Sequence, residues 1–288
     1  MTIRDASTEL KEKLTLIYSK SEAENITELV IEHITGTNRS ERISDKSKQL
    51  NESQGEALLK SIQRLLQHEP VQYVINEAWF CGMKFYVDNN VLIPRPETEE
   101  LVEWIISNLK FPINTLSILD IGSGSGCISI ALKRKLRKAE VWSCDVSPGA
   151  LTVAKRNAET LSADLKFIQL NFLDEKERNN LPLFDIIVSN PPYVPEKNKY
   201  QMSPNVLEYE PRIALFVPDN DPLIFYKTIA EFGKKHLSDS GIIFLELHED
   251  YSNSTEELFK NENYITEIKK DMQGKNRMLL AAKDINRH

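Results

Sequence analysis

Residues 117–126 read SILDIGSGSG, an apolar stretch that ends in three alternating glycines. Glycine lets a backbone turn sharply and approach a ligand, because no Cβ stands in the way. The glycines stand two residues apart, whereas a dinucleotide-binding loop follows the pattern G-x-G-x-x-G. The stretch therefore predicts a strand, a cofactor-binding loop and a helix. The loop residues expected to contact the cofactor are Gly122, Ser123, Gly124, Ser125 and Gly126.

Two carboxylates flank this loop in the predicted sheet. Asp120 precedes it, where a carboxylate suits a cofactor with an ammonium group better than one with a pyrophosphate. Asp145 ends the next predicted strand, where a carboxylate can accept both hydroxyls of a ribose. Asp145 could instead cap the following helix, but Ser147 followed by Pro148 suits that role better. We therefore expect Asp120 and Asp145 to bind the cofactor.

A polar residue and an aromatic residue follow the third predicted strand. Asn171 and Phe172 could contact the adenine of a nucleoside cofactor, with Phe172 stacked on the ring. The alternative is that Phe172 belongs to the hydrophobic core. The sequence leaves both interpretations open.

Strands alternate with helices on both sides of the loop. The predicted strands are 116–121, 140–145, 165–170, 184–189 and 241–247, and the predicted helices are 98–109, 127–138, 148–161 and 222–237. Such alternation implies a parallel sheet that is covered on both faces. Two late strands, 264–270 and 277–283, are joined by a turn too short for a parallel connection. The pattern resembles the seven-stranded class I methyltransferase fold, an α/β fold, although alternation alone would also allow a dehydrogenase.

The first third of the chain has a different pattern of apolar residues. Residues 1–69 carry apolar side chains at helical spacing and predict a small helical bundle. Residues 71–92 are rich in aromatic and β-branched side chains, with Gly82 and Asn89-Asn90 as turns, and predict a hairpin. The expected organisation is a helical domain over 1–69, a linking β-hairpin over 70–93 and a catalytic domain over 94–288.

The motif Asn190-Pro191-Pro192-Tyr193 follows the apolar strand 184–189. Ligands of open α/β sheets bind at the carboxyl ends of the strands. Neither proline has an N–H that could compete for the Asn190 side-chain oxygen. The Asn190 oxygen and the Pro191 carbonyl therefore predict a rigid pair of acceptors for a planar NH₂ group, and Tyr193 offers a ring for stacking. A double-proline turn with a capping asparagine is the structural alternative.

This pair of acceptors indicates methyl transfer to nitrogen. An amide nitrogen is a poor nucleophile because its lone pair is delocalised, and two acceptors oppose that delocalisation. Alignment with a sulfonium methyl group supplies the rest by proximity. Together with the glycine-rich loop, the motif predicts an enzyme that uses S-adenosylmethionine and releases S-adenosylhomocysteine. Asn190, Pro191, Pro192 and Tyr193 are the expected catalytic and substrate-binding residues, and Asn190 would also contact the cofactor.

Four stretches of the chain resemble the HemK/PrmC family. They are QYVINEAWFCG at 72–82, VLIPRPETE at 91–99, NPPYVP at 190–195 and EPRIAL at 210–215. The resemblance extends over nearly the whole chain, and the P-R-P-E-T-E stretch is its most specific part. It implies methylation of the glutamine in the Gly-Gly-Gln motif of peptide chain release factors. It also implies that the bundle and hairpin help to dock the release factor, and that Arg95, Pro96, Glu97 and Thr98 border the site, with Arg95 and Glu97 as substrate-binding residues.

Composition narrows the alternatives. The formal net charge is −7, which counts against a basic groove for nucleic acid. The start of the chain lacks the apolar core of a signal peptide, no run is long enough to span a membrane, and the three cysteines have no metal-ligand spacing. We expect a cytoplasmic monomer without a metal. A ribosomal-protein glutamine, an adenine-N6 in nucleic acid, or a non-catalytic module that keeps the fold remain alternatives.

Overall fold

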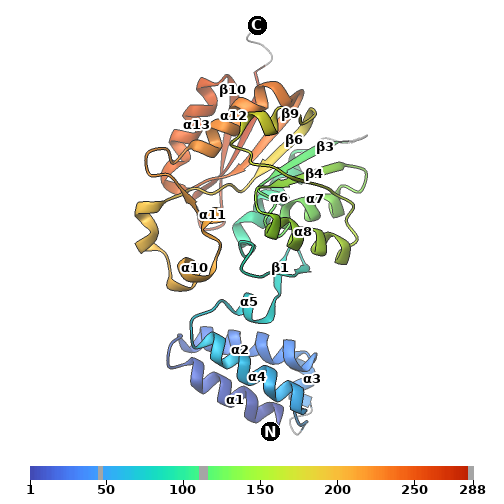
Figure 1. Cartoon of the computed structure of the whole chain (residues 1–288), viewed down its shortest axis with the longest axis vertical. Coiled ribbons are helices and arrows are strands. Elements are labelled where there is room, and N and C mark those ends of the chain that lie inside the picture. The colour runs from blue at the N-terminus through green and yellow to red at the C-terminus, as the bar shows by residue number, and fades with distance from the viewer. Residues whose placement is uncertain (45–47, 110–115, 285–288) are drawn as a thin grey trace. The chain divides into compact units, whose positions relative to one another are not determined.

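A computed structural model describes residues 1–44, 48–109 and 116–284. Contacts divide the chain into two compact units (Figure 1). The first unit contains Met1–Glu77 and the short segment Ser203–Tyr209, and the second contains the rest. No helix among the described residues has both the length and the apolar character needed to cross a membrane.

The first unit is helical, which confirms the predicted bundle. Its helices are α1 (Ile3–Leu14), α2 (Lys20–Thr35), α3 (Arg39–Ser44), α4 (Glu52–Leu65), α5 (Val71–Ile75) and α10 (Pro204–Tyr209). Thr2, Ser19 and Asn51 cap the three long helices by accepting from backbone N–H groups. Leu10, Leu58 and their neighbours form the buried core between these helices. Tyr209 of α10 donates from its hydroxyl to the Gln67 carbonyl at 2.7 Å.

The predicted hairpin is correct only over part of its range. Strands β1 (Ala78–Phe80) and β2 (Met83–Phe85) pair in antiparallel fashion through a turn at Cys81 and Gly82, which have φ of 48° and 71°. Residues 71–75 are helix α5 instead, although valine and isoleucine favour strands. Val71, Val74 and Ile75 pack into the core of the first unit, so burial overrides their local preference.

The second unit is built on a seven-stranded sheet with the order β10-β11-β9-β6-β3-β4-β5. Its strands are β3 (Ser117–Ile121), β4 (Glu140–Asp145), β5 (Lys166–Gln169), β6 (Phe184–Ser189), β9 (Leu237–Glu246), β10 (Tyr264–Lys270) and β11 (Asn276–Lys283). The first five are parallel to one another, and β11 is antiparallel to both β9 and β10. This confirms the predicted class I methyltransferase fold. From the central strand β3, the sheet extends through β4 and β5 on one side and through β6 and β9 on the other.

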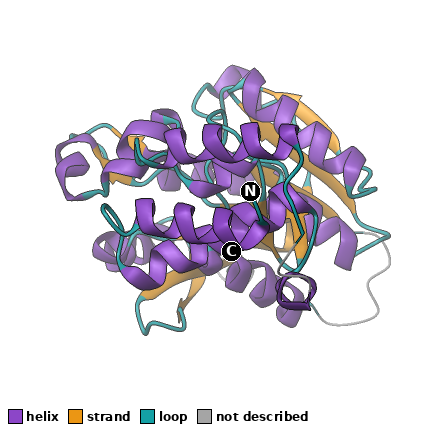
Figure 2. Ribbon diagram, turned by 90° about the horizontal axis from the view of Figure 1, so that it is seen from below, coloured by secondary structure: helices purple, strands orange, loops and turns teal. Residues whose placement is uncertain are grey.

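Helices cover both faces of the sheet (Figures 1 and 2). The covering helices are α6 (Pro96–Asn108), α7 (Cys127–Lys135), α8 (Pro148–Thr160), α12 (Ile224–His236) and α13 (Ser252–Asn261), and the short helices α9 (Glu175–Arg178) and α11 (Arg212–Leu215) complete the unit. Ile118 of β3 faces the core shared with α6 and α7, and its neighbour Leu119 faces the core shared with α12 and α13. This alternation is the period-two pattern of a strand buried on both sides.

Residues 194–217 form an excursion between β6 and α12 that the sequence did not predict. It begins in β7 (Val194–Pro195) and ends in β8 (Phe216–Val217), which pair with each other in parallel. Between them lie a 3₁₀ helix (Glu196–Gln201), α10 and α11. The excursion starts directly after Tyr193, so its two ends meet close to the predicted site.

Candidate active site

A pocket of about 370 Å³ opens in the second unit at the carboxyl ends of β3, β4 and β6. This is the edge at which open α/β sheets bind ligands. The predicted residues that line it are Arg95, Thr98, Gly122, Ser123, Gly124, Ser125, Asp145, Asn171, Phe172, Asn190, Pro191 and Pro192. The predicted residues outside its lining are Pro96, Glu97, Asp120, Gly126 and Tyr193. Folding thus brings most of the expected residues into one cavity.

The glycine loop is shaped by positive backbone angles. Gly122, Gly124 and Gly126 have φ of +83°, +51° and +79°, which L side chains rarely adopt. A Cβ on Gly126 would lie 3.0 Å from Ile130 Cδ1 and 3.2 Å from Ala154 Cβ. A Cβ on Gly122 or Gly124 would meet open space. Gly126 therefore permits close packing of α7 and α8, whereas the other two leave room at the pocket wall.

Asp120 supports the glycine loop through Ser143. Its side chain is fully buried, and its carboxylate accepts from Ser143 Oγ at 3.1 Å. Ser143 Oγ also accepts from Ser123 Oγ at 2.9 Å, since its own single proton goes to Asp120, so the same serine contacts the loop. Burial raises the pKa of Asp120 to about 7. The expected contact between Asp120 and a cofactor ammonium group has no path in this arrangement, because the side chain is covered.

Asp145 lies at the pocket wall, and its carboxylate has unused acceptor positions. Its two oxygens accept from the N–H groups of Gly124 and Ser147, both at 2.9 Å. An ionised carboxylate has about four lone-pair positions, so positions remain for two ribose hydroxyls. Ser147 caps α8 by accepting from Ala150 N at 3.1 Å, and Pro148 is the first helical residue, as predicted. Asp145 is therefore not needed as the cap.

Phe172 belongs to the hydrophobic core and also lines the pocket. It is 5% exposed and packs edge-on against Phe232 of α12, with ring centroids 5.1 Å apart, yet it also lines the pocket. Arg178, which the sequence did not single out, holds this turn: its Nη1 donates to the carbonyls of Phe172 and Leu173 at 3.2 and 3.0 Å. Asn171 is exposed and accepts from Leu173 N at 3.1 Å. A ligand could contact Phe172 only with the part of the ring that faces the cavity.

Asn190 is tied to two other elements by a chain of hydrogen bonds. Its Nδ2 donates to Thr98 Oγ1 of α6 at 3.2 Å, and Thr98 donates to Glu246 Oε2 of β9 at 2.6 Å. Glu246 is 2% exposed, and burial raises its pKa to about 7. Sequence reasoning missed Glu246. A glutamate at the carboxyl end of the apolar strand 241–247 was the signal that could have found it.

Tyr193 lies behind Asn190 instead of facing the cavity. Its hydroxyl donates to Glu246 Oε1 at 3.4 Å, and its ring packs edge-on against His248 with centroids 5.5 Å apart. Burial raises the pKa of Tyr193 above its usual range. Tyr193 does not line the pocket, so its ring is not placed there to stack on a substrate.

The P-R-P-E-T-E stretch is anchored by an ion pair. Arg95 Nη2 lies 2.6 Å from Glu210 Oε1, and Glu210 Oε2 accepts from Ile93 N at 3.3 Å. The Glu210 side chain is 1% exposed. Glu97 points elsewhere and accepts from Gln273 Nε2 at 3.1 Å. Of the two predicted substrate-binding residues in this stretch, only Arg95 borders the pocket.

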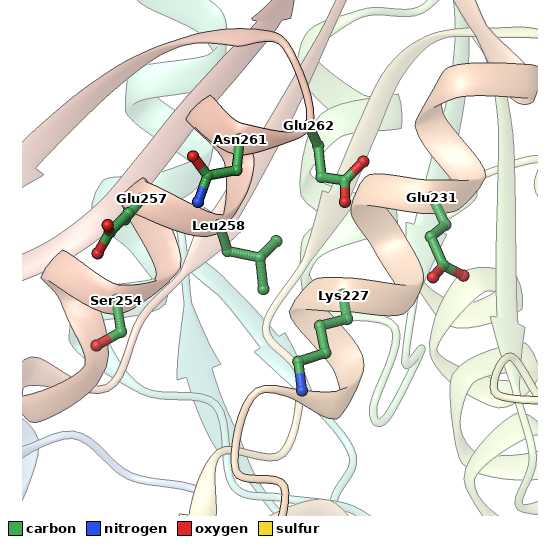
Figure 3. Close-up of a pocket in the computed structure, with 7 residues that line it drawn as sticks. All are labelled: Lys227, Glu231, Ser254, Glu257, Leu258, Asn261 and Glu262. Atoms are coloured by element: carbon green, nitrogen blue, oxygen red, sulfur yellow. The ribbon is translucent and has the colours of Figure 1, made fainter.

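A second hollow lies between α12 and α13 and lacks these features (Figure 3). Its lining is Lys227, Glu231, Ser254, Glu257, Leu258, Asn261 and Glu262. Lys227 is paired with Asp221 at 2.6 Å, and Glu262 is paired with Lys234 of α12. None of the predicted site residues reaches it. Among the residues in 1–44, 48–109 and 116–284, no group of His, Cys, Asp and Glu could hold a metal ion.

Comparison with known proteins gives consistent matches. Residues 3–75 match the PrmC N-terminal domain, and residues 99–209 match the methyltransferase small domain. A release factor glutamine methyltransferase from Flavobacterium psychrophilum is 41% identical over 97% of this chain and 98% of its own length. One from Bacteroides thetaiotaomicron is 38% identical over 94% and 97%. A methyltransferase structure from Pyrococcus furiosus shares the fold at 20% identity, covering 71% of this chain and 91% of that chain, with a TM-score of 0.50.

Proposed function

The chain belongs to the release factor glutamine methyltransferase family, and we propose that it methylates the glutamine of the Gly-Gly-Gln motif in peptide chain release factors. The methyl group would pass from S-adenosylmethionine to the side-chain amide nitrogen, N5, of that glutamine. The observation that carries this proposal is the wall formed by Asn190 and Pro191 in the pocket, next to the glycine loop.

The residues present fit S-adenosylmethionine, which supplies an electrophilic methyl group when bound. Gly122 and Gly124 leave open space where a Cβ would otherwise stand, and Asp145 keeps lone pairs for a ribose. Phe172 and Asn171 line the far side, where an adenine would lie between them and the loop. We therefore assign these residues, with Ser123 and Ser125, to the cofactor. Asp120 and Gly126 would act indirectly, by holding the loop in shape.

The amide substrate would be held by acceptors. The Nδ2 of Asn190 is committed to Thr98, so its oxygen is free to accept one N–H of the glutamine amide. The Pro191 carbonyl would accept the other, and Pro192 cannot compete because it has no N–H. Two acceptors draw the lone pair back onto nitrogen and aim it at the methyl group. The methylated nitrogen then loses one proton easily, so the site needs no strong general base.

The first unit would dock the release factor, and Arg95 would contact substrate at the pocket rim. We further propose that the protein acts as a monomer in the cytoplasm, without direct contact with nucleic acid. The net charge of −7 supports the last point, since a flipped-base mechanism favours a basic groove.

Incubation with methyl-labelled S-adenosylmethionine tests the proposal. A purified release factor should take up one label, and mass spectrometry should place it on the Gly-Gly-Gln glutamine. Replacing that glutamine by alanine should abolish uptake. Parallel reactions with ribosomes and with RNA or DNA test the alternative substrates. Labelling of those substrates with none of the release factor would contradict the proposal.

A further inference from the structure

The network behind Asn190 carries an inference that rests on the proposed function. We infer that Glu246 is a positioning residue for methyl transfer: through Thr98, it turns the Asn190 side chain so that the amide oxygen faces the substrate. Glu246 lies outside the pocket lining and touches Asn190 only through the Thr98 hydroxyl.

The direction of each hydrogen bond follows from its donors. Thr98 has a single hydroxyl proton, and an ionised Glu246 can only accept, so the proton lies on the 2.6 Å line between them. Thr98 then presents only lone pairs to Asn190. The atom of Asn190 that faces Thr98 must be the donor Nδ2, and the acceptor Oδ1 must point the other way. Without this constraint, the Asn190 side-chain amide could rotate by 180° and turn its NH₂ group towards the substrate. The glutamine NH₂ group is itself a donor, so it would then lose its acceptor.

The ionised carboxylate also has an electronic effect along the same line. Hydrogen bonds in a chain polarise one another, and they do so more strongly where water is excluded. A negative charge at Glu246 therefore makes Thr98 a better acceptor and the Asn190 oxygen more electron-rich. That oxygen would hold the glutamine N–H more strongly, which favours a localised lone pair on the nucleophile. Position and polarisation act in the same direction.

The surroundings of Glu246 argue against a purely structural ion pair. Arg277 is a cation that acts on Glu246, but its Nε pairs with Asp271 at 3.2 Å and its Nη1 donates to the Leu247 carbonyl at 3.1 Å. Tyr193 donates to the Glu246 carboxylate, whereas Tyr226 donates to the Glu246 backbone carbonyl. Glu97 is a further negative charge that acts on Glu246. Among the described residues, Glu246 has no salt bridge, although burying an unpaired carboxylate is costly.

A pH dependence follows from this burial. Glu246 has a pKa raised to about 7, chiefly by burial and further by Glu97, while Thr98, Arg277 and Tyr193 oppose the rise. Protonated Glu246 can donate to Thr98, which frees the threonine hydroxyl to donate toward Asn190. The orienting constraint is then lost. Turnover should therefore decrease as the pH falls through about 7.

Substitutions of Glu246 and Thr98 separate orientation from folding. Glu246→Gln keeps the volume and removes the charge, and Thr98→Val keeps the shape and removes the hydroxyl. Both should lower kcat by about tenfold to a hundredfold, as expected for a misplaced catalytic group, with less change in the KM for the release factor. Thr98→Ser keeps the hydroxyl and should retain most of the kcat and the pH step. Thr255→Val is the matched control, since this buried threonine of α13 has no hydroxyl partner among the described residues.

An activity-independent measurement completes the test. In protein labelled with ¹⁵N-asparagine, the side-chain NH₂ signals of Asn190, identified by their loss in Asn190→Ala, should shift with a midpoint near pH 7. The shift should persist in Thr98→Ser and disappear in Glu246→Gln and Thr98→Val. An active wild type together with unchanged kcat and unchanged titration in Glu246→Gln would overturn the inference. An inactive wild type that still shows the titration would instead overturn the proposed function and leave the orienting contact supported.

Discussion

Asn190 donates its side-chain N–H to the hydroxyl of Thr98, a residue of helix α6 that precedes it by 92 positions. Asn190 directly follows β6 and precedes the two prolines, and Thr98 lies in the first turn of α6, within the P-R-P-E-T-E stretch. The two most specific stretches of the sequence therefore meet in one hydrogen bond. The acceptor side of the amide is left free at the pocket wall.

Asn190→Ala tests the acceptor itself. We expect kcat to fall by about a hundredfold or more, as when one oriented polar group is removed from an active site. Binding of S-adenosylhomocysteine, measured by calorimetry, should weaken only a few-fold. Asn108→Ala is the matched control, because Asn108 also donates its amide, to the Trp104 carbonyl, but lies outside the pocket. Wild-type turnover in Asn190→Ala would rule out the proposed role.

Asp145→Asn and Ser147→Ala separate ribose binding from helix capping. The asparagine keeps the size but loses acceptor positions, so affinity for S-adenosylhomocysteine should fall about tenfold to a hundredfold, the range of hydrogen bonds to a charged group. Ser147→Ala should cost about 1 kcal/mol of stability and leave affinity nearly unchanged. Titration calorimetry and urea unfolding measure the two effects. Equal losses of affinity would mean that Asp145 acts only through local structure.

Gly126→Ala and Gly122→Ala should damage different properties. The added Cβ on Gly126 meets Ile130 and Ala154, and the positive φ is retained, so we expect a loss of about 2 kcal/mol in the free energy of unfolding. On Gly122 the Cβ meets open space beside the pocket, and only the backbone strain of about 1 kcal/mol applies. Gly122→Ala should instead lower the affinity for the cofactor, because the added methyl group stands at the pocket wall. Denaturant unfolding and cofactor titration of both variants check this contrast.

Arg95→Ala should reduce stability because it leaves the Glu210 carboxylate buried without its partner. Breaking a buried pair costs about 3 kcal/mol or more, and Glu210 is 1% exposed. The double variant with Glu210→Gln should regain part of that loss, as measured by thermal unfolding. If Arg95 also binds substrate, the double variant will keep a raised KM for the release factor. A normal KM in the double variant would reduce Arg95 to a structural role.

Asp120 should make stability depend on pH. Its pKa is about 7 in the folded protein and near 3.8 in an ordinary environment. Between these values the folded state binds more protons than the unfolded state, so stability falls as the pH rises. Relative to Asp120→Asn, the wild type should lose up to about 1.4 kcal/mol per pH unit in this window. Urea unfolding of both proteins at several pH values measures the difference. A constant difference would contradict the raised pKa.

The sequence predicts the fold and the pocket well where the signals are local. The strand, glycine loop and helix at 117–138, and the cap at Ser147, depend on neighbours in the chain. Helix α13 was missed because its buried residues, Ser252, Thr255 and Phe259, include only one that is apolar. Residues 71–75 were misread because tertiary burial, not strand preference, decides their conformation.

The residues behind the pocket wall could not be assigned in the same way. Thr98 and Glu246 are 148 positions apart, and only the packing of α6 against β9 brings them together. The side-chain directions of Asp120 and Tyr193 depend on the same packing. A motif predicts that such residues matter, but not whether they face a ligand or support a residue that does.

The segment Ser203–Tyr209 has a consequence for dissecting the protein. The chain passes from one unit to the other three times, after Glu77, after Met202 and after Tyr209. A protease that cuts only after Glu77 would therefore leave the two units covalently joined. A truncated fragment that begins at Ala78 would also carry α10 without the helices it packs on, including its bond from Tyr209 to Gln67. The helical bundle therefore cannot be exchanged between proteins by itself, because a chimaera that carries it must also include α10.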